Sequence, residues 1–179
     1  EVQLGEYKGI KVAALDNKTY ETVVSVDFED CKAENPTASY SSSIKTGYAD
    51  GVVNIGNPKA DWLLGNALIG DQANDRRDGD FAVRAKVGGR VEIKQDGDFN
   101  VVEFDAAIYG SDALGVQIKV EYSLDSGATW VEDDELATIS TKELETFRFT
   151  LPEGTKRVAI VVLEGTGNRV NIDNIKLMK

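Results

Sequence analysis

The last apolar run of the chain contains a carboxylate whose surroundings restrict its chemistry. Val170 and Ile172 share one phase of a period-two pattern. Ile175 and Leu177 share the opposite phase, and Asp173 is in register with them, so it points into the core if they do, unless a bulge beside it resets the phase. A buried carboxylate requires a cation or strong hydrogen-bond donors, and calcium prefers carboxylate and carbonyl oxygens. The pattern leaves open a calcium ligand, a bulge, or an aspartate that caps a neighbouring turn.

A second group of acidic side chains lies in residues 71–80. The glycine of this segment is misplaced for an EF-hand loop, and no glutamate follows at the closing position. Arg76 and Arg77 can neutralise the neighbouring carboxylates. We therefore expect a solvated, charge-rich loop in preference to a cation site.

The chain contains no histidine. Its absence removes the usual general base near neutral pH, the Ser-His-Asp and Cys-His arrangements, and most zinc sites. No serine lies in a nucleophile-elbow motif. No set of side chains suited to catalysis can be assembled, so we expect a protein that is not an enzyme.

The most specific pattern of the chain is S-x-D-x-G-x-x-W, formed by Ser123, Asp125, Gly127 and Trp130. Asp125 can hydrogen-bond the backbone ahead of it in an Asx-type turn, and Gly127 can supply a positive φ. We expect Trp130 to re-enter the next strand and pack on the core. The pattern resembles the Asp-boxes of sialidases and of secreted β-modules, where such turns are structural.

Period-two patterning extends over most of the sequence. Residues 81–87, 116–122 and 147–151 alternate apolar and polar side chains, as half-buried antiparallel strands do. Residues 158–163 are continuously apolar, which is typical of a central strand covered on both faces. No stretch shows a helical stripe. The sequence predicts an all-β jelly-roll sandwich of two antiparallel sheets.

The predicted sandwich does not extend over the whole chain. Residues 1–22 differ in pattern and are expected to form an N-terminal extension with one or two strands, followed by the jelly roll over 23–179. Residues 30–60 are rich in Ser, Asn, Gly, Thr and Tyr, and we expect them to form long loops at one end of the sandwich.

Three segments in order resemble jelly-roll modules of the galactose-binding-like and carbohydrate-binding type from secreted bacterial proteins. They are residues 26–30 (VDFED), 78–83 (DGDFAV) and 171–175 (NIDNI). The resemblance implies a structural calcium ion held by Glu29 and Asp173, with Asp80 contributing its carbonyl oxygen. Calcium would then stabilise the fold and take no part in chemistry.

The same resemblance implies that exposed aromatic rings bind sugar. The candidates are Tyr40, Tyr48, Trp62 and Tyr109. Tyr40 and Tyr48 lie in the loop-rich segment, where exposure is expected. Trp62 lies beside two leucines, which also favours a place in the core. Tyr109 precedes a glycine at a strand end and fits either role.

The composition restricts the partners. The net charge is −11, from 31 acidic and 20 basic residues, so binding of nucleic acid through bulk charge is disfavoured. No apolar run approaches the length of a membrane span. The single cysteine, Cys31, cannot form an internal disulfide. We expect a monomer or one module of a larger secreted or cell-surface bacterial protein, which binds glycan. The alternative is a structural spacer or protein-interaction domain without a glycan ligand.

Overall fold

The computed structural model describes residues 18–31, 47–163 and 168–179. Almost all regular structure in these residues is β-strand, and every strand pairing is antiparallel. The strands are β1 (Thr22–Val26), β2 (Gly51–Ile55), β3 (Ala60–Gly70), β4 (Ala82–Ile93), β5 (Phe99–Ile108), β6 (Val116–Ser123), β7 (Val131–Ile139), β8 (Glu145–Thr155), β9 (Arg157–Val162) and β10 (Arg169–Met178).

The strands form two layers. In the first layer β5 lies between β8 and β10, and the other edge of β10 pairs with the first half of β4 and then with β1. In the second layer the order is β7, β6, β9, the second half of β4, the first half of β3, and β2. The prediction of an all-β jelly-roll sandwich of two antiparallel sheets is confirmed.

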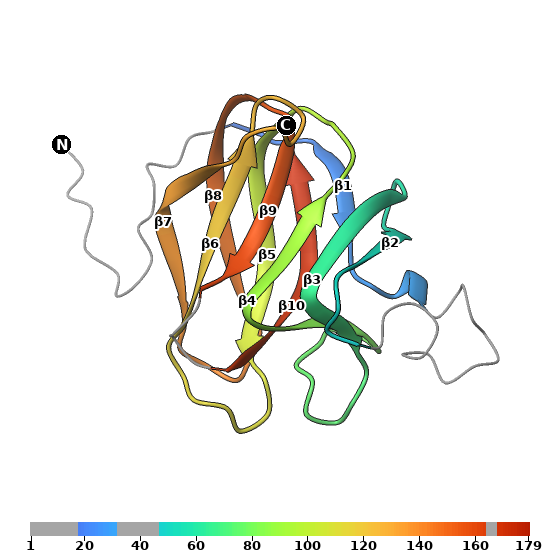
Figure 1. Cartoon of the computed structure of the whole chain (residues 1–179), viewed down its shortest axis with the longest axis vertical. Helices are drawn as coiled ribbons and strands as arrows, with labels where there is room; N and C mark the ends of the chain where they lie inside the picture. Colours follow the sequence, from blue (N-terminus) through green and yellow to red (C-terminus); the bar gives the residue numbers. More distant parts are fainter. Residues whose placement is uncertain (1–17, 32–46, 164–167) are drawn as a thin grey trace.

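Two strands belong to both layers because each bends in the middle. β4 leaves the first layer after Lys86 and joins the second at Arg90. The bend uses Gly88, whose φ is 77°, and Gly89, where a Cβ atom would lie 2.7 Å from the Lys86 carbonyl oxygen. β3 bends at Asn66, whose side chain donates to the Val87 carbonyl at 2.9 Å and ties the two bends together. Figure 1 shows β3 and β4 running obliquely across the other strands.

The core lies between the layers and takes every second residue of most strands. Its largest fully buried side chains include Trp62, Phe28, Phe81, Phe99 and Phe104. The central position predicted for residues 158–163 is confirmed, since β9 lies between β6 and β4. Its burial on both faces is incomplete, because the outward-facing Val161 is only half-buried.

A bulge in β10 decides which face of the sheet Asp173 occupies. The pairing of β10 with β5 shifts between Asp173 and Lys176, and Asn174 has a φ of 47°. Val170, Ile172, Ile175 and Leu177 all belong to the core. Asp173 therefore points away from the core and lies beneath the loop between β3 and β4.

The proposed boundary at residue 22 remains a prediction. β1 begins at Thr22, and Glu21 pairs through its backbone with Lys179, the last residue of the chain. Residues 1–17, on which an N-terminal extension was predicted, lie outside the described residues. Among the described residues no helix is long and apolar enough to cross a membrane.

Residues 123–130 form the predicted turn between β6 and β7. Asp125 accepts the Thr129 backbone N–H at 2.8 Å and the Thr129 hydroxyl at 2.6 Å, while Ser123 accepts the Gly127 N–H at 2.8 Å. The Thr129 hydroxyl, the Thr129 N–H and the Ser123 hydroxyl lower the pKa of Asp125 to about 2. Gly127 has a φ of 88°. The turn is therefore fixed by its own side chains.

The expected packing of Trp130 on the core is wrong. Trp130 is partly exposed and does not belong to the core cluster. Its ring lies beneath the Arg90 guanidinium, whose carbon is 4.4 Å from the ring centroid, on the outer face of the second layer. Trp130 therefore covers the outside of the sheet.

Substitution of Gly127 tests the turn. Gly127→Val should lower the free energy of unfolding by about 1–3 kcal/mol, because a β-branched residue resists positive φ. A Cβ atom here would also lie 3.0 Å from an Arg157 side-chain nitrogen. Gly127→Asn, which tolerates a left-handed backbone, should lose much less. Urea unfolding of both variants measures the difference, and equal losses would show that φ is not the cause.

Candidate functional site

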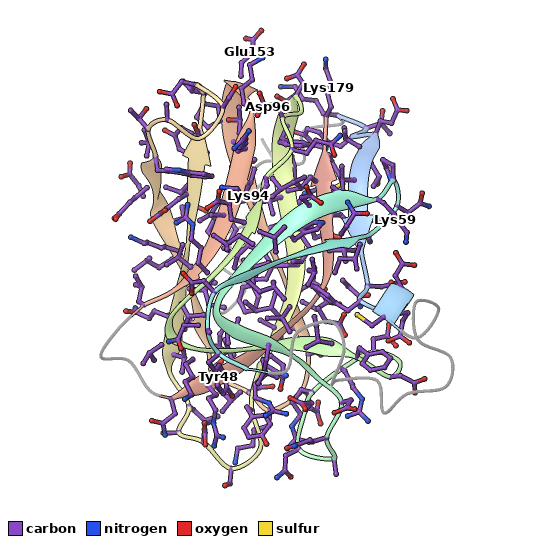
Figure 2. The ribbon with its side chains drawn as sticks, turned by 45° about the vertical axis from the view of Figure 1, so that its right-hand side comes forward. Tyr48, Lys59, Lys94, Asp96, Glu153 and Lys179 are labelled. Carbon is purple, nitrogen blue, oxygen red and sulfur yellow. The ribbon has the colours of Figure 1, made fainter. Side chains whose placement is uncertain are left out.

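Aromatic and basic side chains from distant parts of the sequence meet at the lower end of the sandwich. Figure 1 shows the β3–β4 and β5–β6 loops at this end, and Figure 2 places Tyr48 there. β4 contributes two cations, β10 contributes one at its first residue, and the residues just before β2 and just after β5 contribute the rings. We call these residues the Tyr48 cluster: Tyr48, Arg84, Lys86, Tyr109 and Arg169.

Each ring of the Tyr48 cluster contacts cations. The guanidinium carbons of Arg84 and Arg169 lie 4.5 and 4.3 Å from the Tyr109 ring centroid, and Tyr109 is only 6% exposed. The Lys86 ammonium lies 4.0 Å from the Tyr48 ring centroid. Such contacts hold a cation at a fixed place beside an aromatic surface. Tyr48 remains half-buried.

A hollow of about 340 Å³ opens beside these rings, lined by Lys86, Val87, Asn168 and Arg169. Its lining combines one apolar side chain with an ammonium, an amide and a guanidinium. Concave sites that mix apolar contact with a few placed polar groups are typical of small-ligand binding.

The Arg84 side chain is held in place by hydrogen bonds to Asp75, which lies in the loop between β3 and β4. Two hydrogen bonds join them, Nε to Oδ1 at 2.8 Å and Nη2 to Oδ2 at 2.6 Å, and the Asp75 side chain is fully buried. Burial alone would raise the pKa of Asp75, but hydrogen bonds from Arg84, Asn171 and the Gln72 N–H lower it below its ordinary value. The pair fits because a Cβ atom on Gly70 would lie 2.5 Å from Asp75 Oδ1.

Arg169 is fixed in the same way by Asp112. Its Nε and Nη2 atoms donate to the Asp112 carboxylate at 2.8 and 2.9 Å. These bonds lower the pKa of Asp112 and raise that of Arg169. Both arginines are therefore paired to carboxylates, whereas no described carboxylate forms an ion pair with Lys86.

The four aromatic candidates for sugar binding differ in their location and exposure. Tyr48 lies in the cluster with part of its ring exposed. Tyr109 also lies there, but it is buried between two arginines and offers no face to a ligand. Trp62 is 1% exposed in the core, so it is excluded as a sugar platform. Tyr40 lies outside the described residues.

Sequence reasoning missed the charged residues around Tyr48. Arg84 and Lys86 occupy outward positions of the alternating run in β4, which marked them only as solvent-facing. Their approach to Arg169 follows from the pairing of β4 with β10, in which Lys86 lies opposite Arg169. No local pattern in the sequence predicts the register in which β4 pairs with β10.

Of the three calcium candidates, Asp80 lies in the loop between β3 and β4, and Glu29 and Asp173 contact the backbone of that loop. Glu29 Oε1 accepts the backbone N–H groups of Asp80 and Phe81 at 2.8 and 2.9 Å. Asp173 accepts the Asp78 N–H and the Asn174 N–H, both at 2.8 Å. Among the described residues no group of three or more acidic, histidine or cysteine side chains is arranged to hold a metal. The described donors to Glu29 and Asp173 are backbone N–H groups, and calcium binding here remains a prediction.

The ionised form of the Asp173 carboxyl group is nevertheless disfavoured by its surroundings. Its side chain is completely buried, and burial raises its pKa to about 7 despite the two backbone N–H donors. The carboxylates of Asp78 and Asp105 contribute to the raised pKa. The ionised form of Asp173 is thus poorly compensated by the described residues.

Most residues of the acidic segment 71–80 are exposed, as expected of a solvated loop. Asp75 is the exception: it is buried and is neutralised by Arg84 of β4, not by Arg76 or Arg77 as expected. The side chains of those two arginines donate to backbone carbonyl groups instead. The segment covers the outer face of the first layer and forms the floor of the Tyr48 cluster.

A second surface with an aromatic ring lies on the outer face of the second layer. Beside Trp130, the Arg90 guanidinium bridges Glu92 and Glu121, and Lys119 bridges Glu121 and Glu132. Each of these charges has an opposite charge beside it. Lys94 also pairs with Glu92, so three cations face three carboxylates and the surface is electrically balanced, which distinguishes it from the Tyr48 cluster.

No family model matches the sequence, and no curated protein matches it. Three β-sandwiches among solved structures are similar in fold. CBM61 in complex with β-1,4-galactotriose is 17% identical over 65% of this chain and 86% of its own, with a TM-score of 0.44. A CBM29-2 mutant, K85A, is 16% identical over 72% and 91%, with a TM-score of 0.49. The K1 cleaved adhesin domain of Lys-gingipain from Porphyromonas gingivalis is 12% identical over 63% and 82%, with a TM-score of 0.48.

Proposed function

We propose that this chain is a non-catalytic module that binds carbohydrate at the Tyr48 cluster. The observation that carries the proposal is the half-exposed Tyr48 ring beside a hollow lined by Lys86, Asn168 and Arg169. An aromatic ring offers an apolar face for the C–H groups of a pyranose. The ammonium, amide and guanidinium groups offer hydrogen bonds to hydroxyl groups.

The cluster suits binding better than turnover. Glycoside hydrolysis requires two carboxyl groups that act as acid and as base or nucleophile. At this end Asp75 and Asp112 each accept two hydrogen bonds from an arginine. Those bonds lower the pKa of both carboxyl groups, which keeps them ionised and unsuited to donate a proton.

We also propose a calcium ion in the loop between β3 and β4 and a location outside the cell. A calcium ion at Glu29, Asp80 and Asp173 would compensate the buried charge of Asp173 and stabilise the loop that carries Arg84's partner. The module would belong to a secreted or cell-surface bacterial protein, where it meets glycans. The poorly compensated Asp173 carboxylate supports the calcium proposal.

Removal of the Tyr48 ring tests the site. A glycan-array screen in calcium-containing buffer identifies a ligand, and Tyr48→Ala should then weaken its binding about ten-fold or more, which corresponds to about 1.4 kcal/mol of lost contact. Tyr20→Ala is the matched control. Tyr20 is also half-buried beneath an arginine, with the Arg148 guanidinium carbon 5.1 Å from its ring centroid. It lies next to Glu21, which pairs with Lys179 at the opposite end of the sandwich.

Two results would contradict the proposal. Equal effects of the two tyrosine substitutions would mean that the Tyr48 cluster is not the site. A clean negative array on a folded sample would favour the structural spacer or protein-interaction domain.

A further inference from the structure

We propose that the Tyr48 cluster selects glycans that carry an anionic substituent, a carboxylate or a sulfate ester, over neutral glycans of the same length. This inference rests on the proposed function. It names the class of ligand from the charges at the hollow.

The charges of the cluster do not cancel. Three cations, Arg84, Lys86 and Arg169, lie within contact of its two rings. Asp75 and Asp112 neutralise the two arginines through paired hydrogen bonds. Among the described residues no carboxylate pairs with Lys86, which is exposed on the wall of the hollow. One positive charge is therefore left over where a ligand would bind.

This local positive charge lies on a protein whose net charge is strongly negative. The chain as a whole has a net charge of −11, and that field disfavours an approaching polyanion. At physiological ionic strength the field of exposed charges fades beyond about 8 Å. A group inside the hollow is closer than that to Lys86 and to the unshared edge of Arg169, so the local charges decide its binding energy.

The cation–π contact between Lys86 and Tyr48 is weak enough for a ligand to replace it. An exposed cation–π contact contributes less than a charge-assisted hydrogen bond to a carboxylate or sulfate oxygen. The ammonium can therefore turn from the ring toward the ligand and uncover the ring surface at the same time. A neutral sugar would have to share that ring with the ammonium and would gain only neutral-acceptor hydrogen bonds.

The test uses ligands that differ only in charge. Isothermal titration calorimetry would compare oligogalacturonides in their de-esterified form with the same chains fully methyl-esterified, which keeps the length and removes the charge. We expect at least ten-fold tighter binding of the de-esterified chains, which weakens as salt is added. A second pair, a galactan oligosaccharide with and without sulfate esters, shows whether any anionic group suffices or a carboxylate is required.

A set of lysine substitutions assigns the preference to Lys86. Lys86→Gln keeps most of the side-chain stem and should remove the preference, whereas Lys86→Arg keeps the charge and should retain it. Lys94→Gln is the matched control, because Lys94 follows the other end of the same strand, where it pairs with Glu92 (Figure 2). Melting temperatures of all three variants verify that each is folded.

The outcomes separate this inference from the proposed function. A preference for the charged chains that is lost in Lys86→Gln and retained in Lys94→Gln supports it. Equal binding of charged and neutral chains, or a preference that survives Lys86→Gln, overturns it and leaves glycan binding in place. An absence of any glycan ligand on the array overturns both.

Discussion

Asp75→Asn should lower the free energy of unfolding by about 3–5 kcal/mol, the cost of leaving a buried charge without its partner. Asparagine has the shape of aspartate but lacks the charge that faces Arg84. Asp75 is fully buried and Arg84 nearly so, with side-chain exposures of 0% and 9%. The substitution would leave the guanidinium buried and facing an amide. Urea unfolding of both proteins measures the loss.

Asp96→Asn is the control for this prediction. Asp96 also pairs with an arginine, Arg157, at 2.6 Å, but its side chain is 43% exposed. Water screens that pair, so the expected loss is much smaller than for Asp75→Asn. Similar losses in the two variants would show that burial does not set the importance of the Asp75–Arg84 pair.

The same pair gives a pH dependence. The pKa of Asp75 is lowered in the folded protein, so its contribution is fully present above its unfolded pKa near 3.8. The contribution is lost as the pH falls through the lower folded value. Wild-type protein should therefore lose stability more steeply below about pH 4 than Asp75→Asn does.

Asp173→Asn should have opposite effects with and without calcium. In chelator at pH 8 the variant should be more stable than wild type by about 2–3 kcal/mol. A pKa raised from 3.8 to about 7 corresponds to about 4 kcal/mol, and the amide loses one accepted hydrogen bond worth about 1 kcal/mol. In calcium, wild type should rise in melting temperature because the ion binds only the folded state. The variant should not respond to calcium.

The pH dependence of wild type in chelator has a definite sign. Asp173 binds its proton more tightly when folded, so stability falls as the pH rises from about 4 to about 7 and stays low above. The neighbouring carboxylates of Asp78 and Asp105 contribute to this trend. Asp173→Asn should flatten it.

Each half of the Asp173 prediction can be contradicted by a separate result. If calcium leaves the wild-type melting curve unchanged, the calcium proposal is wrong. If the variant is less stable than wild type in chelator at pH 8, the buried carboxylate is compensated in some other way. Glu103→Gln is the control, since Glu103 lies on β5, pairs with the exposed Lys176 of β10 and should change neither response.

Local pattern was enough to predict the strands and the Asp-box turn. Alternation in residues 116–122 is retained in β6 because one face of this strand is buried and the other faces outward. In the first half of β4 the outward-facing Arg84 is buried as well, under the β3–β4 loop that carries Asp75. The turn at Asp125 is stabilised by contacts within seven residues, from Ser123 to Thr129. Structure of this kind depends on neighbours in sequence and can be inferred from them.

The orientation of the aromatic rings could not be inferred in the same way. Trp62 was a candidate for sugar binding and lies in the core, whereas Trp130 was expected in the core and lies outside. A shift of one residue reverses the face that a side chain occupies. The pairing of β6 with β7 is also irregular between Lys119 and Glu121, where β7 has two extra residues.

The sequence by itself determined an antiparallel sandwich, a self-contained turn at Asp125, the absence of histidine chemistry and an acidic surface, because each of these follows from composition or from contacts between near neighbours. Only the tertiary structure decided that a bulge turns Asp173 beneath the β3–β4 loop, that Asp75 neutralises Arg84, and that Lys86 stands beside Tyr48 without a carboxylate partner among the described residues. These features depend on the pairing of β4 with β10 and on the bend at Gly88, which join residues far apart in the chain. Long-range register of this kind is set by the packing of the whole core.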